Sequence, residues 1–361
     1  QPVLGGFGSD VPLVEVSLRC GDHRESIQSL KGELLSLVTD VESAYWSLLQ
    51  AHYDLKILTR LLERGVAVRE RLRPRRRMDV TGAQWSDAVA RVSSRETDVQ
   101  VAQQTLRSAS DQLKLLLNDP QLPVGSELLM LPADDTITEA VAYNFGQSLQ
   151  TAFRYRPEIQ QSILAMDDTS IRLDVADNGR LPRLDLSLQA QWHALSDSTS
   201  ESYSDVLEGQ YIDYIAALQF EYPIGNRAAE ALYSQRLMER LQASLAYDNT
   251  VQQVTSEVQA SLRTVETSYA LIGQTTQSRI AAAENLRTLT VEQQANIGFT
   301  VESLDLEFRR QEALAQAERD EITARVSYNN SLSRLYASMG TSLERNRIKF
   351  VVPDEDELLN P

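Results

Sequence analysis

The chain of 361 residues is poor in the side chains that carry most catalytic and metal chemistry. Its three histidines, His23, His52 and His193, are scattered, and Cys20 is its one cysteine. Catalytic and metal sites commonly need clustered histidines or thiolates. The sequence contains neither a phosphate-cradling glycine loop nor a nucleophile elbow. We therefore expect no catalytic residue, no metal site and no cofactor, and predict that the protein is not an enzyme.

Two short charged stretches are of more interest. Six arginines fall within the nine residues 69–77 (RERLRPRRR), although the formal net charge of the chain is −16. This acidic total argues against general nucleic-acid binding, because phosphate contacts need a basic surface. A rod that binds nucleic acid through these arginines is kept as an alternative.

The second charged stretch contains the carboxylates Glu302, Asp305 and Glu307. If several chains brought this stretch to one axis, each carboxylate would be repeated around it. Such rings select cations and can gate a narrow pore. The three residues are therefore candidates for a pore constriction, and an ordinary solvated helix face is the other interpretation.

The elements that would position these charges are long helices. Apolar residues recur at alternating steps of four and three from Leu30 to Leu62, and at steps of seven from Trp85 to Leu113. This heptad pattern is typical of paired helices. Residues 18–119 are predicted to form a helical hairpin that ends near Asn118. Its tip, near 73–80, contains Arg73, Pro74, Arg75, Arg76, Arg77, Met78 and Asp79.

A second hairpin is predicted over residues 225–342. Its helices are separated by the break NIGFT and end at Gly340, a residue that suits a helix C-terminus. The tip, near 296–301, contains Ile297, Gly298, Phe299 and Thr300. Residues 120–181 are predicted to be a connecting helical region, and residues 343–361 an acidic tail. Periodicity alone also fits a structural coiled-coil scaffold without channel activity.

Between the hairpins, residues 182–224 alternate as strands do. Leu184, Leu186, Leu188 and Trp192 fall on one face, and polar residues fall on the other. Each strand has about ten residues, the length of a tilted transmembrane β-strand, and the polar loop 196–209 is predicted to be exposed. A hairpin on a soluble sheet would alternate in the same way. Two strands cannot close a barrel, so the membrane interpretation requires several chains.

Two similar junctions indicate an internal duplication. QPVLGGFGSD at the start and YPIGNRAAEA at Tyr222 each place proline, an aliphatic residue and glycine before a long helix. Residues 1–17 are predicted to hold the end of a strand region and the first junction. The junction residues are Pro2, Pro223, Gly225 and Asn226.

In these pieces and their order the sequence resembles the TolC-like outer-membrane efflux protein family. The matching segments are VESAYWSLLQAHYDL, RPEI, LPRLDLSLQAQW, FEYPIGNRAAEA, NIGFTVESLDLEFRRQEALAQAE and YNNSLSRLYASMGT, which are spread over nearly the whole chain. The resemblance implies a mainly α fold with a β-barrel portion. It also implies a homotrimer in which a long antiparallel α-helical barrel continues into a transmembrane β-barrel.

The resemblance further implies a function and partners. Such a protein would be the outer-membrane channel subunit of a tripartite efflux or secretion system, with its helices in the periplasm. Its helical tips would dock a periplasmic adaptor that connects it to an inner-membrane pump. Its barrel would contact outer-membrane lipid. No nucleic-acid partner is expected. We expect the family's first helical stretch and first strand to lie before residue 1. The first tip departs from the family's glycine-containing apolar turn, whereas the second tip keeps it. The transported substrate is left open.

Overall fold

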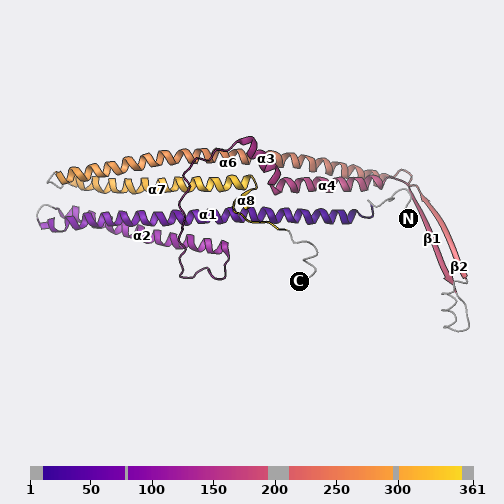
Figure 1. Cartoon of the computed structure of the whole chain (residues 1–361), viewed down its shortest axis with the longest axis horizontal. Helices are drawn as coiled ribbons and strands as arrows, with labels where there is room; N and C mark the ends of the chain where they lie inside the picture. Colours follow the sequence, from indigo (N-terminus) through magenta and orange to yellow (C-terminus); the bar gives the residue numbers. More distant parts are fainter. Residues whose placement is uncertain (1–10, 78–79, 194–210, 296–300, 352–361) are drawn as a thin grey trace, which may run out of the picture. The chain divides into compact units, whose positions relative to one another are not determined.

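The computed structural model describes residues 11–77, 80–193, 211–295 and 301–351. The chain divides into two compact units. Unit 1 comprises Gln1–Leu30 and Pro157–Gln252, and unit 2 comprises Lys31–Arg156 and Gln253–Pro361. Long helices dominate both units (Figure 1), so the mainly α fold class is confirmed. Among the described residues, no helix combines the length and the apolar character needed to cross a membrane.

The described residues form ten elements. They are α1 (Val14–Leu72), the short 3-10 helix η1 (Pro74–Arg77), α2 (Gly82–Leu117), α3 (Phe145–Tyr155), α4 (Pro157–Asn178), β1 (Arg183–His193), β2 (Tyr211–Glu221), α6 (Arg227–Ala295), α7 (Val301–Ser338) and α8 (Ser342–Arg345).

In unit 2, α1 and α2 pack along the predicted heptad seam. Ala44, Leu48 and Ala51 of α1 are buried against Leu106 and Leu113 of α2. The seam does not extend to the start of α1: Leu37 is 43% exposed. The reason is length, because α2 has 36 residues and α1 has 59, so the first turns of α1 lie beyond the end of α2.

The ends of α2 have well-formed caps. The Thr81 hydroxyl accepts a hydrogen bond from the backbone N–H of Gln84, and the Gln84 side chain accepts one from the backbone N–H of Thr81. This reciprocal capping box satisfies two backbone donors at the helix start. At the other end Asn118 takes the left-handed conformation, with φ 46°, as the predicted terminator should.

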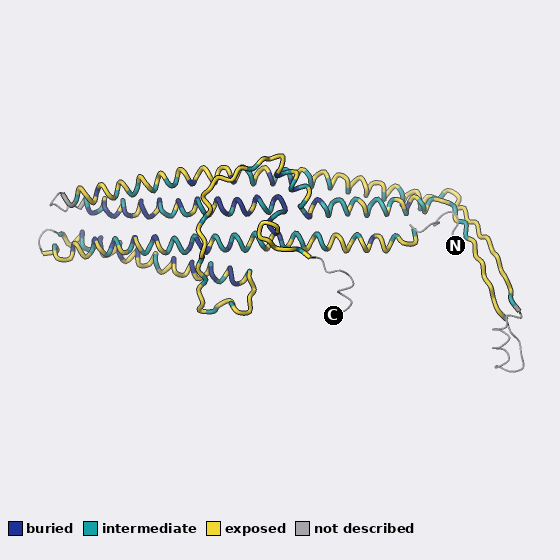
Figure 2. The backbone as a smooth tube through the Cα atoms, in the orientation of Figure 1, coloured by how far each residue is buried: buried dark blue, intermediate teal, exposed yellow. Residues whose placement is uncertain are grey.

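A second apolar face of α1 packs on α7. Ile57 and Leu61 are buried against Ala315. Nearer the tip, Val68 is buried in a cluster that includes Phe308. The heptad pattern predicted only the partner within the hairpin. Figure 2 shows buried residues recurring along α1 and α7.

Helices α6 and α7 form the second hairpin of unit 2. Val265 and Ile272 of α6 lie in one core cluster with Tyr328 and Leu335 of α7. The hairpin ends at Gly340, whose φ is +72°. A Cβ atom there would lie 2.8 Å from the backbone carbon of Tyr155, so both the conformation and the space require glycine.

The region 120–181, predicted to be a connecting helical region, is helical only in its second part, where α3 and α4 lie. Helix begins only at Phe145, and residues 119–143 form neither helix nor strand. Three prolines and Gly125, with φ +81°, disfavour helix there. Asn329 of α7 binds the N–H and the C=O of Ile137 on this segment at 3.2 and 3.1 Å. The hydroxyl of Tyr53 on α1 donates to Asp135 at 2.8 Å. The segment is therefore tied to both hairpins.

Unit 1 brings together the start of α1, the helix α4, the first part of α6 and the two strands. Ser162 of α4 hydrogen bonds Thr250 of α6 at 3.2 Å, and Arg240 donates to Ser170 at 3.0 Å. Asp168 of α4 lies against Gly21 of α1, where a Cβ atom would lie 2.6 Å from its carboxylate. Burial, together with the charge of Asp22, raises the pKa of Asp168.

Candidate functional site

The arginine tip is more ordered than a bare cluster of like charges would be. Arg69 and Arg73 both pair with Glu70, at 3.2 and 3.4 Å. The Arg76 guanidinium lies 4.6 Å from the ring centroid of Trp85, in cation–π geometry. These contacts hold the turn together, because each offsets part of the repulsion among the arginines.

The remaining tip arginines also keep exposed surface. Arg71 forms an ion pair with Glu307 of α7 and is still 44% exposed, Arg77 is exposed and Arg75 is half-buried. The first tip therefore offers a basic surface in which Arg69, Arg71 and Arg73 are partly neutralised by ion pairs. Met78 and Asp79 lie outside the described residues, as do Ile297, Gly298, Phe299 and Thr300 of the second tip.

The three constriction candidates at the start of α7 have different surroundings. Glu302 is exposed. Asp305 is 32% exposed and pairs with Arg91 of α2 at 2.8 Å and with Arg309 at 2.7 Å. Glu307 is 6% exposed and is held between helices by its arginine partner. Of the three, Glu302 and Asp305 keep exposed carboxylate surface, whereas Glu307 is almost fully covered.

A buried arginine that the sequence analysis did not single out belongs to the same interface. Arg95 of α2 is 3% exposed. Its position carries a signal, because it lies seven residues after Ala88 and seven before Ala102, in a row of buried small residues. An arginine in an apolar heptad row needs polar partners from neighbouring helices. Those partners come from α1 and α7.

The strands pair antiparallel in a register that gives the sheet two distinct faces. Leu184 lies opposite Phe220, Leu186 opposite Leu218, and Trp192 opposite Ile212, so one face is apolar along its whole length. The other face carries the pairs Arg183–Glu221, Asp185–Gln219, Ser187–Ala217, Gln189–Ile215 and Gln191–Asp213. The alternation predicted for each strand therefore becomes one continuous apolar surface.

This apolar face is largely uncovered. Leu188 is 76% exposed, Tyr214 is 79% exposed and Leu218 is 67% exposed. Figure 2 shows both strands as exposed over most of their length. Helix or disorder over residues 183–222 would have favoured the coiled-coil scaffold, whereas the described part of this range contains the two strands β1 and β2. The loop 196–209 lies outside the described residues.

The second junction is built around one arginine. Gly225 and Asn226 have φ +82° and +27°, which turn the chain from β2 into α6. The Asn226 side chain donates to the backbone carbonyl of Arg180 at 3.1 Å. The Arg180 guanidinium pairs with Glu230 at 3.0 Å and lies 4.5 Å from the Tyr233 ring centroid. Pro223 precedes the turn, and Pro2 of the first junction lies outside the described residues.

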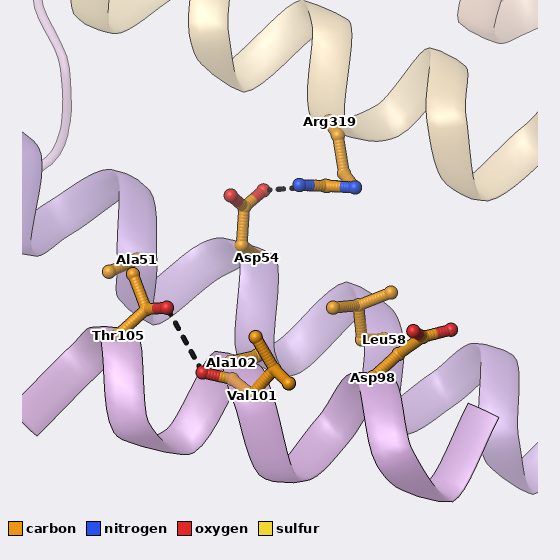
Figure 3. Close-up of a pocket in the computed structure, with 8 residues that line it drawn as sticks. All are labelled: Ala51, Asp54, Leu58, Asp98, Val101, Ala102, Thr105 and Arg319. Carbon is orange, nitrogen blue, oxygen red and sulfur yellow. Dashed lines mark hydrogen bonds and ion pairs between the residues drawn. The ribbon is translucent and has the colours of Figure 1, made fainter. Parts of the chain in front are cut away.

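A groove of about 330 Å³ lies where α1, α2 and α7 meet in unit 2 (Figure 3). Asp54 of α1 pairs with Arg319 of α7 at 3.1 Å on one wall. The rest of the lining is apolar except for the Asp98 carboxylate and the Thr105 hydroxyl. The ion pair joins Asp54 to Arg319, which leaves Asp98 as the other charged group of the groove. Among the described residues, no group of three His, Cys, Asp or Glu side chains is placed to hold a metal ion.

Known proteins share this fold. It is similar to a membrane protein from Pseudomonas aeruginosa, with a TM-score of 0.70 and 17% identity over 90% of this chain and 72% of that one. For the Campylobacter jejuni CmeC outer membrane channel the values are 0.67 and 16%, over 92% and 67%. For the Vibrio cholerae outer membrane protein VceC they are 0.70 and 15%, over 91% and 76%. No curated protein matches the sequence.

At such low identities these likenesses establish the fold alone. The model of the outer membrane efflux protein family matches residues 148–341, more than half of the chain, including α4, both strands, α6 and α7. The chain therefore belongs to the outer membrane efflux protein family, that of the TolC-like channels.

Proposed function

We propose that the protein is the outer-membrane channel subunit of a tripartite efflux or secretion system. In this proposal three copies form a passive conduit whose β-barrel crosses the outer membrane and whose helices form a periplasmic tube. A periplasmic adaptor docks at the helical tips and connects the tube to an inner-membrane pump. The protein conducts the substrate and performs no catalysis.

The apolar face of the strand hairpin is the observation that carries this proposal. A two-stranded sheet with one uncovered apolar face is marginal in water. In lipid its outer edges would leave backbone donors and acceptors unpaired. Both problems disappear when several chains place their hairpins side by side in one closed barrel. The apolar face then meets lipid, and the face with Asp185 and Ser187 meets the lumen.

An exposed stripe on α6 supports assembly. In unit 1, Leu237, Leu241 and Leu245 follow one another at steps of four and are 40–56% exposed. Steps of four place these side chains on one side of a helix. The stripe is what a helix shows when its partner belongs to another chain, as expected in a tube that several copies build.

The test is a measurement on the full-length protein in detergent and in planar bilayers. Native mass spectrometry should report a trimer, and the trimer should form ion-conducting channels. A protein that stays monomeric in several detergents, or a trimer that never conducts, would contradict the proposal. Adaptor binding is measured separately, with an adaptor encoded next to this protein as the probe.

A further inference from the structure

Arg95 is held by partners from two other helices. One terminal nitrogen of its guanidinium donates to the backbone carbonyl of Leu61 on α1 at 3.0 Å and to the Gln311 side chain on α7 at 2.9 Å. The other lies 3.3 Å from Glu312 of α7. Burial lowers the pKa of Arg95, and Glu312 opposes that shift. The guanidinium thus joins three helices at one point.

An aromatic ring lies close to both Arg95 and the arginine one turn before it. The guanidinium groups of Arg91 and Arg95 lie 5.2 and 5.1 Å from the ring centroid of Phe308, which is fully buried. On α7, Asp305 and Glu312 lie about one turn before and after this ring, and Arg91 reaches both, at 2.8 and 3.6 Å. Arg91, Arg95, Asp305, Phe308 and Glu312 therefore form one group of contacts between α2 and α7.

The space for Arg95 is provided by a glycine. Gly65 of α1 faces the guanidinium, and a Cβ atom there would lie 2.7 Å from Nη1 and 3.3 Å from Cδ. Gly273, another helical glycine, would meet nothing within 4 Å. A side chain at position 65 would therefore require the Arg95 guanidinium to shift.

We infer that Arg95 is a positioning residue that sets the axial position and the rotation of α7 relative to the α1–α2 hairpin. Apolar heptad seams tolerate more than one register, whereas a buried polar group with fixed partners selects a single register. The planar guanidinium has a fixed set of donor directions, so its bonds to Leu61 and Gln311 form together in one arrangement only. Through Phe308 and Arg91 that arrangement also fixes the position of Asp305.

This inference rests on the proposed function only where it concerns the pore. If the start of α7 lines the conduit, the register set by Arg95 determines how far Asp305 reaches into it. The register itself is a property of unit 2 and can be measured whether or not the protein conducts. The two ideas can therefore fail separately.

The first measurement uses Arg95→Met, which keeps length and apolar contact but removes the charge and its bonds. Spin labels are placed at two exposed positions, Ser94→Cys on α2 and Ala313→Cys on α7, with Cys20→Ser in the background. Labelled chain is diluted with unlabelled chain so that single pairs are observed. We expect one narrow distance in the parent protein and a broadened or split distribution in Arg95→Met.

Thermal stability separates positioning from a purely structural contribution. Removing one partner of a buried polar contact is destabilising, whereas replacing both partners with apolar side chains of similar shape can be nearly neutral. Arg95→Met alone leaves the buried Gln311 oxygen without its donor and should lower the melting temperature. We therefore expect Arg95→Met combined with Gln311→Met to lose the single register with little or no loss of melting temperature. Arg107→Met is the matched control, because Arg107 is exposed on the same helix, and it should change neither quantity.

The glycine supplies a second, independent variant. Gly65→Ala should lower the melting temperature and broaden the distance distribution, whereas Gly273→Ala should do neither. In the Arg95→Met background Gly65→Ala should cost less, because the flexible apolar chain can make room; neighbouring residues that interact are not additive. A narrow distribution in Arg95→Met, or additive effects of Gly65→Ala and Arg95→Met, would overturn the inference.

In planar bilayers, loss of the register should raise the resting conductance severalfold or widen the spread of conductance values among single channels. Failure of the parent protein to conduct would count against the proposed function alone.

Discussion

A single charge placed on either face of β1 provides a sensitive test of the proposed barrel. Leu188 is the sixth of the eleven residues of β1, lies on the apolar face and pairs with Ala216. At about 3.3 Å per residue the middle of this strand lies roughly 16 Å from each end, near the centre of a hydrocarbon layer about 30 Å thick. Leu188→Arg would therefore put a guanidinium at the most costly depth.

The size of the effect follows from that depth. An arginine on the lipid face at the midplane costs about 2–4 kcal/mol. Since a tenfold change in an equilibrium constant corresponds to about 1.4 kcal/mol, the folding equilibrium constant of the barrel should fall by roughly 30- to 700-fold for each chain. In a trimer the charge occurs three times, for a total of about 6–12 kcal/mol if the three sites act independently.

The matched control is Ser187→Arg, one residue earlier and therefore on the opposite face at almost the same depth. The lumen face is wet in the proposal, so this variant should assemble nearly as well as the parent. The assay is the fraction of heat-resistant trimer recovered from outer membranes at equal expression. A membrane-impermeant thiol reagent should also label Ser187→Cys through the pore and spare Leu188→Cys. Equal loss of trimer in the two arginine variants, or labelling at 188 instead of 187, would refute the assignment of the faces.

Further predictions concern the tips and the two units. Asp305→Asn should raise single-channel conductance or weaken cation selectivity, because it removes a carboxylate that could line the pore; an unchanged record would place the constriction elsewhere. Charge reversal of Arg75 and Arg77 together should slow adaptor association and weaken its salt dependence without affecting trimer assembly, which surface plasmon resonance and native mass spectrometry can check. Gly340→Ala should cost about 1–2 kcal/mol for the left-handed backbone alone, and more for the close backbone contact, as measured by chemical denaturation. Asp168→Asn should flatten the pH dependence of stability. Since the folded state raises the pKa of Asp168, stability falls as pH rises from the ordinary aspartate pKa through the folded one, and a calorimetric pH series that keeps this slope would contradict the assignment.

Local chemistry made much of the helical framework predictable. The heptad rows led to both hairpins, and Asn118 and Gly340 marked helix ends that the structure shows in left-handed conformations. The alternation in β1 and β2 predicted the faces of each strand, and the register then joined them into one surface. These features depend on neighbouring residues or on a short repeat, so a single sequence contains the information.

Contacts between distant segments were not predictable in the same way. Glu307 was a reasonable constriction candidate next to the second tip, but its arginine partner lies 236 residues earlier in the chain. Nothing in the local sequence distinguishes this buried carboxylate from the exposed Glu302. The partly irregular connection before α3 shows the same limit, because Asn329 and Tyr53 hold it from segments far away. One long-range contact does have a signal in the local sequence, because Arg95 interrupts a row of small buried residues.

The double apolar face of α1 has a consequence for how the protein is made. One face can pack as soon as α2 has been synthesised, but the face that contains Ile57 and Leu61 packs against Ala315, about 250 residues later. Until α7 emerges, this stripe stays exposed on a chain that still has to reach its final compartment. Contacts of such long sequence separation form slowly, and the apolar face that is exposed until then favours aggregation. The nascent protein should therefore depend on holdase chaperones for nearly its whole length, and truncations before α7 should be degraded instead of accumulating as folded fragments.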